Sequence, residues 1–506
     1  MIRRLASLLI CLILVSAISP AFGDHLTFRG DAQRNGNVDG TGPSSPDLLW
    51  SEKLTAKGYI GSSAAVYGNR VYVSSWPDMS YKGEQALGCL DAEDGSVLWL
   101  NPLGGKGGAS TPAISDGLVF AGSWDGDLYC LDAVTGETVW NRTVEEDPKW
   151  WGVASSPLVI EEMIFVTTFS EGALHVLDLS GDELWNISTG KIDPYTSPAG
   201  DEGRVYFAGG DPALYCVDTS SFELLWKHPT EAPITSTPAI KDGNAYFATT
   251  EDLRAVDAET GEEIWLAPLK GTISSPALSF DRVYIGTDDA SLKGFNASDG
   301  SLIWSVEVDS SVKSSPLVVG DKVYFGTYRG VVYALNCSDG SEVWTYDTEA
   351  YLMSAPSFSD GVLYIGSDDG RLRAFGEEAS KLIFEGEVLL GDGSFNATVE
   401  DGEIYSVDER SALGALIKAS ETGGFEITFD NSLVDGYGLL ARAIGGIEPG
   451  TEEIWRYVVN YPDEPMPTVG PDRFPLEEGD VVTFYLGDRN SSPEESLRVE
   501  ITTGWE

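Results

Sequence analysis

Side chains that could perform catalytic or metal chemistry are few and scattered in this sequence. The three histidines, His25, His175 and His228, are far apart along the chain, whereas zinc ligands usually occur at short spacings. Neither a Gly-x-Ser-x-Gly elbow nor a phosphate-binding glycine loop is present. Acidic turns such as Asp125-Gly126-Asp127 lack the full set of oxygen ligands that a calcium loop supplies. We therefore expect neither a metal site nor a catalytic site, and we predict that the protein is not an enzyme.

Aromatic residues offer another kind of chemistry, the stacking of sugars, peptides or flat ligands. Five aromatic residues stand just before short segments that share one pattern, and they are Tyr59, Trp150, Trp151, Tyr195 and Tyr351. Aromatic rings in a concave mouth suit such ligands, because they combine a large apolar face with polar edges. These five residues form our candidate ligand mouth. The alternative is that their rings pack together as a plug.

The segments that follow each contain a pair of small residues. The pairs are Ser62-Ser63, Ser110-Thr111, Ser155-Ser156, Thr196-Ser197, Ser236-Thr237, Ser274-Ser275, Ser314-Ser315 and Ser354-Ala355, so that fifteen of the sixteen residues are Ser or Thr. Where eight strands converge on a central channel, small residues are required, and hydroxyls can bond to the neighbouring backbone. We therefore expect these pairs to have a structural role.

A repeat of about 40 residues positions all these segments, and a period in this range is the signature of a repeat architecture. Eight tryptophans mark it: Trp50, Trp99, Trp140, Trp185, Trp226, Trp265, Trp304 and Trp344. The unit between Thr111 and Trp140 contains four strand-like pieces, which are separated by the turn pairs Asp116-Gly117, Asp125-Gly126 and Thr135-Gly136. Four antiparallel strands in each repeat are typical of a β-propeller blade.

The number of blades follows from counting the repeats. Eight segments open a unit, but only seven tryptophans close one afterwards, and Trp50 precedes the first opening. We therefore predict that the strand around Trp50 pairs beside the third strand of the last unit, near Leu372–Phe375, and joins the two ends of the ring. The predicted fold is an all-β eight-bladed propeller of four-stranded antiparallel blades over residues 24–376.

The closing segments LDAEDGSVLW, LDAVTGETVW and VDAETGEEIW resemble the tryptophan-docking motif of pyrroloquinoline-quinone-type propeller repeats. In that family the indole of one blade packs against the next, and the resemblance implies this blade-docking role for all eight tryptophans. Its enzymes hold the quinone under a disulfide between adjacent cysteines, beside calcium. This chain has no adjacent cysteine pair, and no Glu, Asn and Asp set can be placed on the calcium site. We expect no cofactor, and a quinone-dependent dehydrogenase remains the alternative.

Residues 380–506 break the repeat. Strands are expected at Leu382–Leu390 and Phe395–Tyr405, a helix at Ser411–Ser420, and strands around Glu426–Phe429, Ile454–Asn460 and Val481–Leu486. The segments EIWRYVVNYPDEP and PLEEGDVVTFYL are similar to the small α+β, β-grasp-like domain of the transcobalamin C-terminal type. That resemblance implies a domain that is frequent at the ends of prokaryotic surface proteins.

Composition points to the outside of the cell. Residues 1–23 read as a secretory signal peptide, with Arg3-Arg4, an apolar run from Leu5 to Ile18, and small residues before Asp24. The apolar run is short for a transmembrane helix, and no later segment could span a bilayer.

The formal net charge of −48 would repel nucleic acid and anionic membranes. We expect a secreted or cell-surface acidic protein, whose acidity serves either solvation or the attraction of basic partners.

Two further residue types fit this location. Cys89, Cys130 and Cys216 occupy the same place in successive repeats, too far apart for disulfides, so we expect small buried thiols, with Cys337 in a turn. Six Asn-x-Ser/Thr sequons are candidate N-glycosylation sites: Asn141, Asn186, Asn296, Asn336, Asn396 and Asn490.

Together these features predict a monomeric, non-enzymatic binding or scaffold protein whose partner is another cell-envelope protein or a surface glycan. Two alternatives stay open, a quinone-dependent dehydrogenase and a binder of carbohydrate or another small ligand at the aromatic mouth.

Overall fold

The computed structural model describes residues 25–54, 58–77, 86–108, 110–146, 148, 151–193, 195–201, 203–376, 382–390, 393–399, 404–423, 427–430, 440–444, 454–460, 471, 475–477, 480–487 and 498–505. The expected signal peptide, Trp150 and Asn490 lie outside these residues. The chain divides into two compact units, Met1–Glu377 and Glu378–Glu506. Within the described residues, none of the helices has the length and apolar character needed to cross a bilayer.

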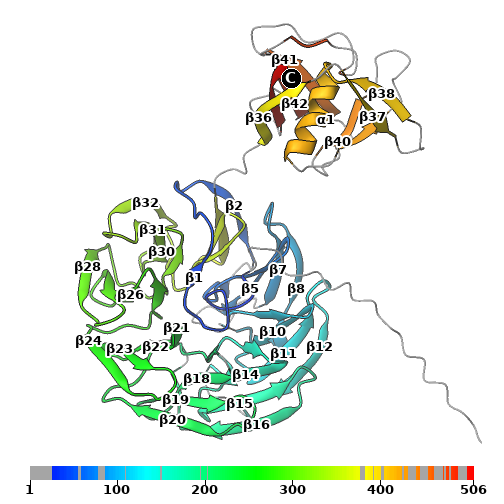
Figure 1. The fold of residues 1–506 in the computed structure, drawn as a ribbon. Coiled ribbons are helices and arrows are strands. Elements are labelled where there is room, and N and C mark those ends of the chain that lie inside the picture. Colours follow the sequence, from blue (N-terminus) through cyan, green and yellow to red (C-terminus); the bar gives the residue numbers. More distant parts are fainter. Residues whose placement is uncertain are drawn as a thin grey trace, which may run out of the picture. The chain divides into compact units, whose positions relative to one another are not determined.

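Eight blades of four antiparallel strands follow one another around a ring in the first unit (Figure 1), which confirms the predicted eight-bladed propeller; one blade gains a fifth, parallel strand. In chain order the first four blades are β4 (Ala65–Tyr67), β5 (Arg70–Ser74), β7 (Leu87–Asp91) and β8 (Val97–Asn101); β9 (Ala113–Ser115), β10 (Leu118–Gly122), β11 (Asp127–Asp132) and β12 (Thr138–Thr143); β13 (Leu158–Ile160), β14 (Met163–Thr167), β15 (Ala173–Asp178) and β16 (Glu183–Ser188); and β17 (Ala199–Asp201), β18 (Arg204–Ala208), β19 (Ala213–Asp218) and β20 (Leu224–Pro229).

The other four blades are β21 (Ala239–Lys241), β22 (Asn244–Ala248), β23 (Asp252–Asp257) and β24 (Glu263–Pro268); β25 (Ala277–Ser279), β26 (Arg282–Thr287), β27 (Ser291–Asn296) and β28 (Leu302–Glu307); β29 (Leu317–Val319), β30 (Lys322–Gly326), β31 (Val331–Asn336) and β32 (Glu342–Asp347); and β33 (Ser357–Ser359), β34 (Val362–Gly366), β35 (Arg371–Phe375) and β2 (Leu48–Lys53). Shorter elements are β1 (Asn37–Val38), β3 (Gly58–Tyr59), β6 (Trp76–Pro77) and the 3-10 turn Leu103–Gly105.

The last blade takes its fourth strand from the other end of the chain, as predicted. β2 pairs antiparallel with β35, and Trp50 lies opposite Ala374. The indole of Trp50 is buried with Tyr364 and Leu372 in one apolar cluster. This pairing covers the strand edge that an open ring would expose.

A β-bulge turns each closing tryptophan toward the next blade. In the fifth blade, Ala255 pairs with Trp265 while Val256 pairs with Glu263, so that Ile264 is skipped. The same shift precedes the tryptophan in every blade. An extra residue in one strand bends it and re-aims its side chains. The skipped aliphatic residue is left facing solvent, and Ile264 is 45% exposed.

Most of the indoles then bind a carbonyl in the following blade. Trp265 Nε1 donates to Ala297 O at 2.8 Å, and the hydroxyl of Tyr246 donates to the same oxygen at 3.4 Å. Equivalent Tyr–Trp pairs bind Ala133 O, Ala258 O, Cys337 O and Pro43 O. Trp50 and Trp140 bind Ala92 O and Leu179 O without a tyrosine. Each carbonyl therefore fixes the position of one blade against its neighbour.

The repeated motif contains a glycine because its turn packs closely against the indole of the preceding blade. Gly261 has φ 72°, and a Cβ added to it would lie 2.7 Å from the ring of Trp226. Glycine alone combines this backbone conformation with so close an approach. The exception is Phe222, which takes the equivalent position at φ 56° and stacks on Trp185 at 5.6 Å. Its ring replaces the glycine contact with an aromatic one.

The segment before β2 forms a hub at the centre of the ring, which the sequence analysis did not predict. Its main chain bonds in order to the first strands of the blades: His25 to Val66, Leu26 to Ile114, Ala32 to Gly200, Gln33 to Ile240, Asn35 to Leu278 and Gly36 to Val318. β1 then pairs parallel with β29. Residues 25–38 therefore connect blades that are far apart in the sequence.

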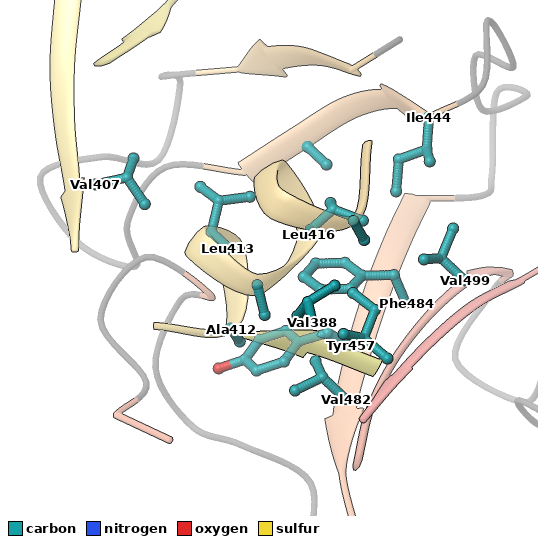
Figure 2. Close-up of a cluster of buried hydrophobic side chains, with 14 of the residues drawn as sticks. Val388, Val407, Ala412, Leu413, Leu416, Ile444, Tyr457, Val482, Phe484 and Val499 are labelled. Carbon is teal, nitrogen blue, oxygen red and sulfur yellow. The ribbon is translucent and has the colours of Figure 1, made fainter. Parts of the chain in front are cut away.

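The second unit consists of β36 (Leu382–Leu390), β37 (Ser394–Thr398), β38 (Ile404–Asp408), α1 (Ala412–Gly423), β39 (Ile427–Asp430), β40 (Leu440–Ile444), β41 (Ile454–Val459), β42 (Val481–Gly487) and β43 (Arg498–Trp505). Its main sheet has the order β36-β43-β42-β41, with β36 and β43 parallel. Leu413 and Leu416 of α1 pack into a core with Val388, Phe484 and Val499 (Figure 2).

Two expectations for this unit were wrong. The single strand predicted at Phe395–Tyr405 is a hairpin of β37 and β38, and the pair Asp401-Gly402, a turn signal in the sequence, stands between them. The helix is longer than predicted and begins at Ala412. β40 and β43 were not predicted, because no regular spacing marks them.

Candidate functional site

Two arginines of the hub close one end of the central channel. Arg34 is fully buried, and its guanidinium donates to Phe28 O at 2.6 Å, Pro157 O at 2.8 Å and Pro198 O at 3.3 Å. Arg29 donates to Pro276 O at 2.6 Å. Burial lowers the pKa of both guanidinium groups to about 9, so both stay charged at neutral pH. The channel floor therefore carries positive charge within a strongly acidic chain.

The small-residue pairs form a hydrogen-bonded ring above this floor. The main-chain N–H of one blade donates to the hydroxyl of the next at about 3 Å, in the links Ser63 to Thr111, Thr111 to Ser156, Ser156 to Ser197, Ser197 to Thr237, Thr237 to Ser275, Ser275 to Ser315 and Ala355 to Ser63. The missing link falls at Ala355, which has no hydroxyl. This geometry supports the expected structural role and explains why Ser and Thr occupy these positions.

The candidate mouth residues lie at the other end of the channel, on the connections between blades. Trp151 is half-buried. Its ring centroid lies 4.7 Å from that of Trp124, 5.5 Å from that of Trp76 and 5.9 Å from that of Tyr195. Tyr59 of β3 pairs with Trp76 of β6. The ring of Trp151 is thus part of an aromatic cluster, an arrangement in keeping with the alternative of packed rings.

Tyr351 forms a second aromatic group at the same end. Its ring is 51% exposed and lies parallel to that of Tyr328, with 4.8 Å between centroids. The ammonium of Lys313 sits 4.6 Å from the centroid of Tyr328. The mouth therefore has two aromatic groups, one around Trp151 and one at Tyr328 and Tyr351.

Sequence reasoning missed a second ring of mouth positions. A residue just after the second strand of each blade reaches this end of the channel. It stands two places after the strand in seven blades and one place after the longer β26, and the eight residues are Trp76, Trp124, Phe169, Gly210, Thr250, Asp288, Tyr328 and Asp368. A signal was available, because these positions repeat with the period of the blades. They were overlooked because their residue types differ from blade to blade.

A cavity joins the mouth to the hydroxyl ring. Its enclosed part is about 80 Å³, within a wider hollow of about 670 Å³ that includes open solvent, and Phe28 of the hub lies at its floor. Trp76, Trp151 and Tyr195 line one part of its wall, and Lys313 contributes a charged group. The enclosed part is smaller than the roughly 300–1,000 Å³ of ordinary small-molecule sites, so a ligand held here would also contact the open mouth.

Two of the charged groups at the mouth, Lys313 and Asp368, have no ion-pair partner among the described residues. Asp368 donates its main-chain N–H to Tyr351 O at 3.0 Å, but its Oδ1 is buried without a hydrogen bond. Burial raises the pKa of Asp368 to about 6, and the charge of Asp369 adds to this effect. Burial likewise raises the pKa of Asp193, beside Tyr195. The mouth thus holds an unpaired ammonium and carboxylates that are poorly solvated.

Trp151 also adopts a costly backbone conformation. Its φ is 65°, in the left-handed region that a bulky residue rarely enters. Strain of this kind persists where the surrounding structure enforces it, and it is concentrated at functional sites. Trp151 is therefore the residue of the mouth to which a function is most readily assigned.

The remaining candidates lie away from the mouth. His175 bonds to Glu183 at 2.8 Å and His228 to Gly261 O at 3.0 Å. Cys89, Cys130, Cys216 and Cys337 are buried free thiols. Within the described part of the chain, no three His, Cys, Asp or Glu side chains are grouped to hold a metal ion.

The described sequons differ in the exposure of their side chains. Asn141, Asn186 and Asn396 are exposed on strands. Asn296 and Asn336 are the last residues of β27 and β31 and are half-buried. Asn296 Oδ1 accepts the N–H of Ser298, and Asn336 Nδ2 donates to Ser341 Oγ. The amides of Asn141 and Asn186 are bonded as well, to Asp127 Oδ2 and Glu183 Oε1, so hydrogen bonding does not separate the sequons.

Comparison with known proteins identifies the family to which this chain belongs. The family model of the outer membrane protein assembly factor BamB matches residues 34–194, 170–265 and 249–397, which is well over half of the chain. The chain belongs to the BamB family. The match contains the hub residue Arg34 and every blade, and it supports the resemblance to quinone-type propeller repeats.

Individual BamB proteins show the extent of the similarity. The chain is 30% identical to BamB of Yersinia pestis over 318 residues, which cover 58% of this chain and 78% of that one. It is 30% identical to BamB of Legionella pneumophila over 200 residues, 38% of this chain and about half (51%) of that one. The crystal structure of BamB from Moraxella catarrhalis superposes with a TM-score of 0.54 at 20% identity, over 65% of this chain and 99% of that one.

Quinone enzymes with the same repeat are more distant. A quinohemoprotein alcohol dehydrogenase of Comamonas testosteroni is 25% identical over 43% of this chain and 34% of its own length. The residues of the present mouth do not fit a quinone site of that type. The chain has no adjacent cysteines, and all four described thiols are buried within the blades. The site therefore gives no basis for a reaction through a quinone.

Proposed function

We propose that this BamB-family chain is a non-enzymatic scaffold of the cell envelope, on which other envelope proteins assemble. The family match over residues 34–397 carries the proposal, because its named relatives are protein assembly factors. A closed ring with a rigid hub suits a docking platform, since little order must be gained on binding. The proposal includes a leader at residues 1–23, a monomeric propeller at 24–376 and a transcobalamin C-terminal-like domain at 380–506.

The scaffold role predicts a defined defect when the protein is removed. In a strain that lacks the chain, we expect a small group of envelope proteins to fall severalfold, as measured by quantitative mass spectrometry of the envelope fraction. Expression of the intact chain should restore them, and cytoplasmic proteins serve as the control. An unchanged envelope proteome would refute the scaffold role.

The alternative of a quinone enzyme is tested on the purified protein. After incubation with pyrroloquinoline quinone and calcium and subsequent gel filtration, we expect no quinone absorbance to remain with the protein. No alcohol-dependent reduction of an artificial electron acceptor is expected. Turnover that requires added quinone would show that the protein is an enzyme.

One hairpin turn on the face opposite the mouth is a candidate contact for a protein partner. Phe280 at the tip of β25 and β26 is 64% exposed and has φ 50°. The corresponding turns in other blades carry residues such as Asp242-Gly243 or Asp360-Gly361. An exposed aromatic at positive φ adds nothing to the stability of its turn, and aromatic anchors are enriched in interfaces. Beside it, Lys241, Asp242 and Arg282 line a groove of about 870 Å³.

Phe280→Gly separates binding from folding. Glycine accepts the positive φ, so we expect a stability gain of about 0.5–1 kcal/mol in urea unfolding. Recovery of envelope partners with the immobilised protein should fall severalfold. The matched control is Phe222→Gly, which changes the same residue type at positive φ in a turn that packs on Trp185. Equal recovery with Phe280→Gly and the wild type would exclude this contact.

A further inference from the structure

The mouth of the channel contains hydrogen-bond donors and an acceptor that lack partners among the described residues. The indole N–H groups of Trp76 and Trp124 are buried without an acceptor, and Asp368 Oδ1 is buried without a donor. The ammonium of Lys313 lines the same cavity and makes no ion pair within the described residues. Buried polar atoms that lack partners are uncommon in folded proteins and call for an explanation. Trp76 and Lys313 line that cavity, whereas Trp124 and Asp368 lie outside its lining. A ligand that both donates and accepts hydrogen bonds would reach Asp368 only if it extended to Tyr351, to which Asp368 is bonded.

The electrostatics of the mouth argue against charged ligands. The chain has a formal net charge of −48, which repels anions at long range, and the positive charge of the channel floor and cavity lining is confined, among the described residues, to Arg29, Arg34 and Lys313. A cation would be drawn to the tyrosine pair, but Lys313 already lies 4.6 Å from the ring centroid of Tyr328. An uncharged ligand avoids both penalties, and a sugar hydroxyl can donate to Asp368 and accept from Lys313.

The aromatic rings supply the apolar half of such a site. Tyr351 is 51% exposed and Tyr328 is 36% exposed, and they stack parallel to each other. Across the mouth, Trp151 is held at φ 65° against Trp76 and Trp124. Rings that present a face beside polar groups match the C–H faces and hydroxyl edges of a pyranose.

We propose that the channel mouth binds an uncharged carbohydrate, with a sugar ring stacked on Trp151 or Tyr351 and its hydroxyls bonded to Lys313 and Asp368. This site lies at the opposite end of the channel from the Phe280 turn, so it is independent of the scaffold role. The enclosed part of the cavity is only about 80 Å³, so the sugar ring would lie at the open mouth above it. The more exposed tyrosine pair would contact the units that follow.

The test begins with the intact protein on a glycan array that carries neutral, acidic and amino-sugar oligosaccharides. We expect binding to a subset of the neutral glycans. Titration of the best free oligosaccharide should shift the tryptophan fluorescence and saturate at millimolar concentration or below. Failure to bind any neutral glycan, or binding of acidic glycans alone, would overturn the proposal.

Two variants tie the binding to this site. Trp151→Gly removes the ring while glycine accepts the positive φ, so the fold should be retained and the affinity should fall at least about tenfold. Lys313→Met keeps the length of the side chain and removes its charge, with a similar expected loss. Lys270→Met, at a lysine that is 79% exposed and lies outside the cavity lining, is the matched control and should bind as the wild type does. Unchanged affinity in the Trp151→Gly and Lys313→Met proteins would refute the site.

Discussion

Removal of residues 24–52 is expected to abolish the folded propeller and cause aggregation. The deletion takes away Leu48–Glu52 of β2, and so exposes the edge of β35 and the apolar side chains that pack on Trp50. It also removes the hub, whose main chain bonds to six blades and whose Arg34 reaches two of them. An unpaired strand edge beside an apolar surface is a site of association between chains. Size-exclusion chromatography with light scattering, together with thermal unfolding, measures the outcome.

A point variant separates the two parts of this effect. Trp50→Ala keeps the backbone pairing of β2 and the hub, and it loses only the indole and its bond to Ala92 O. We expect this protein to stay monomeric with a lower melting temperature. If the deleted protein were also monomeric, with the melting temperature of the wild type, neither β2 nor the hub would be needed to close the ring.

Trp265→Ala is expected to lower the free energy of unfolding of the propeller by about 3–5 kcal/mol, the usual cost of truncating a large buried aromatic. The indole is 7% exposed, its Nε1 donates to Ala297 O at 2.8 Å, and a Cβ on Gly300 would lie 2.5 Å from its ring. The loss therefore combines a cavity with a broken link between the fifth and sixth blades. Urea unfolding, followed by near-UV circular dichroism, provides the measurement.

Trp265→Phe is the matched control for packing. It keeps an aromatic ring in the site, and the hydroxyl of Tyr246 still reaches Ala297 O at 3.4 Å. The expected cost is about 1–2 kcal/mol, which reflects one hydrogen bond and a small loss of volume. A loss below about 1 kcal/mol for Trp265→Ala itself would contradict the docking role of this residue.

The candidate site was predictable in part. Tyr59, Trp151, Tyr195 and Tyr351 lie at one end of the channel, because connections between the fourth and first strands of successive blades all lie at one end of a propeller; Trp150 lies outside the described residues. Trp76, Trp124 and Asp368 were missed, although their positions repeat with the blades. Their residue types vary, and only the folded ring brings these turns within reach of Trp151 and Tyr351.

The sequence by itself determined the blade count, the four strands of each blade and the closure of the ring by the Trp50 strand. These features follow from short-range patterns, namely turn pairs, apolar strands and one tryptophan in each repeat, and from counting them. Only the tertiary structure decided how residues 25–38 are used. This segment has no repeat and little apolar periodicity, and its order comes from main-chain bonds to strands up to hundreds of residues away. Such partners exist only once the ring has closed, and for the same reason the unpaired charges of Lys313 and Asp368 could not be assigned to one mouth before the fold was known.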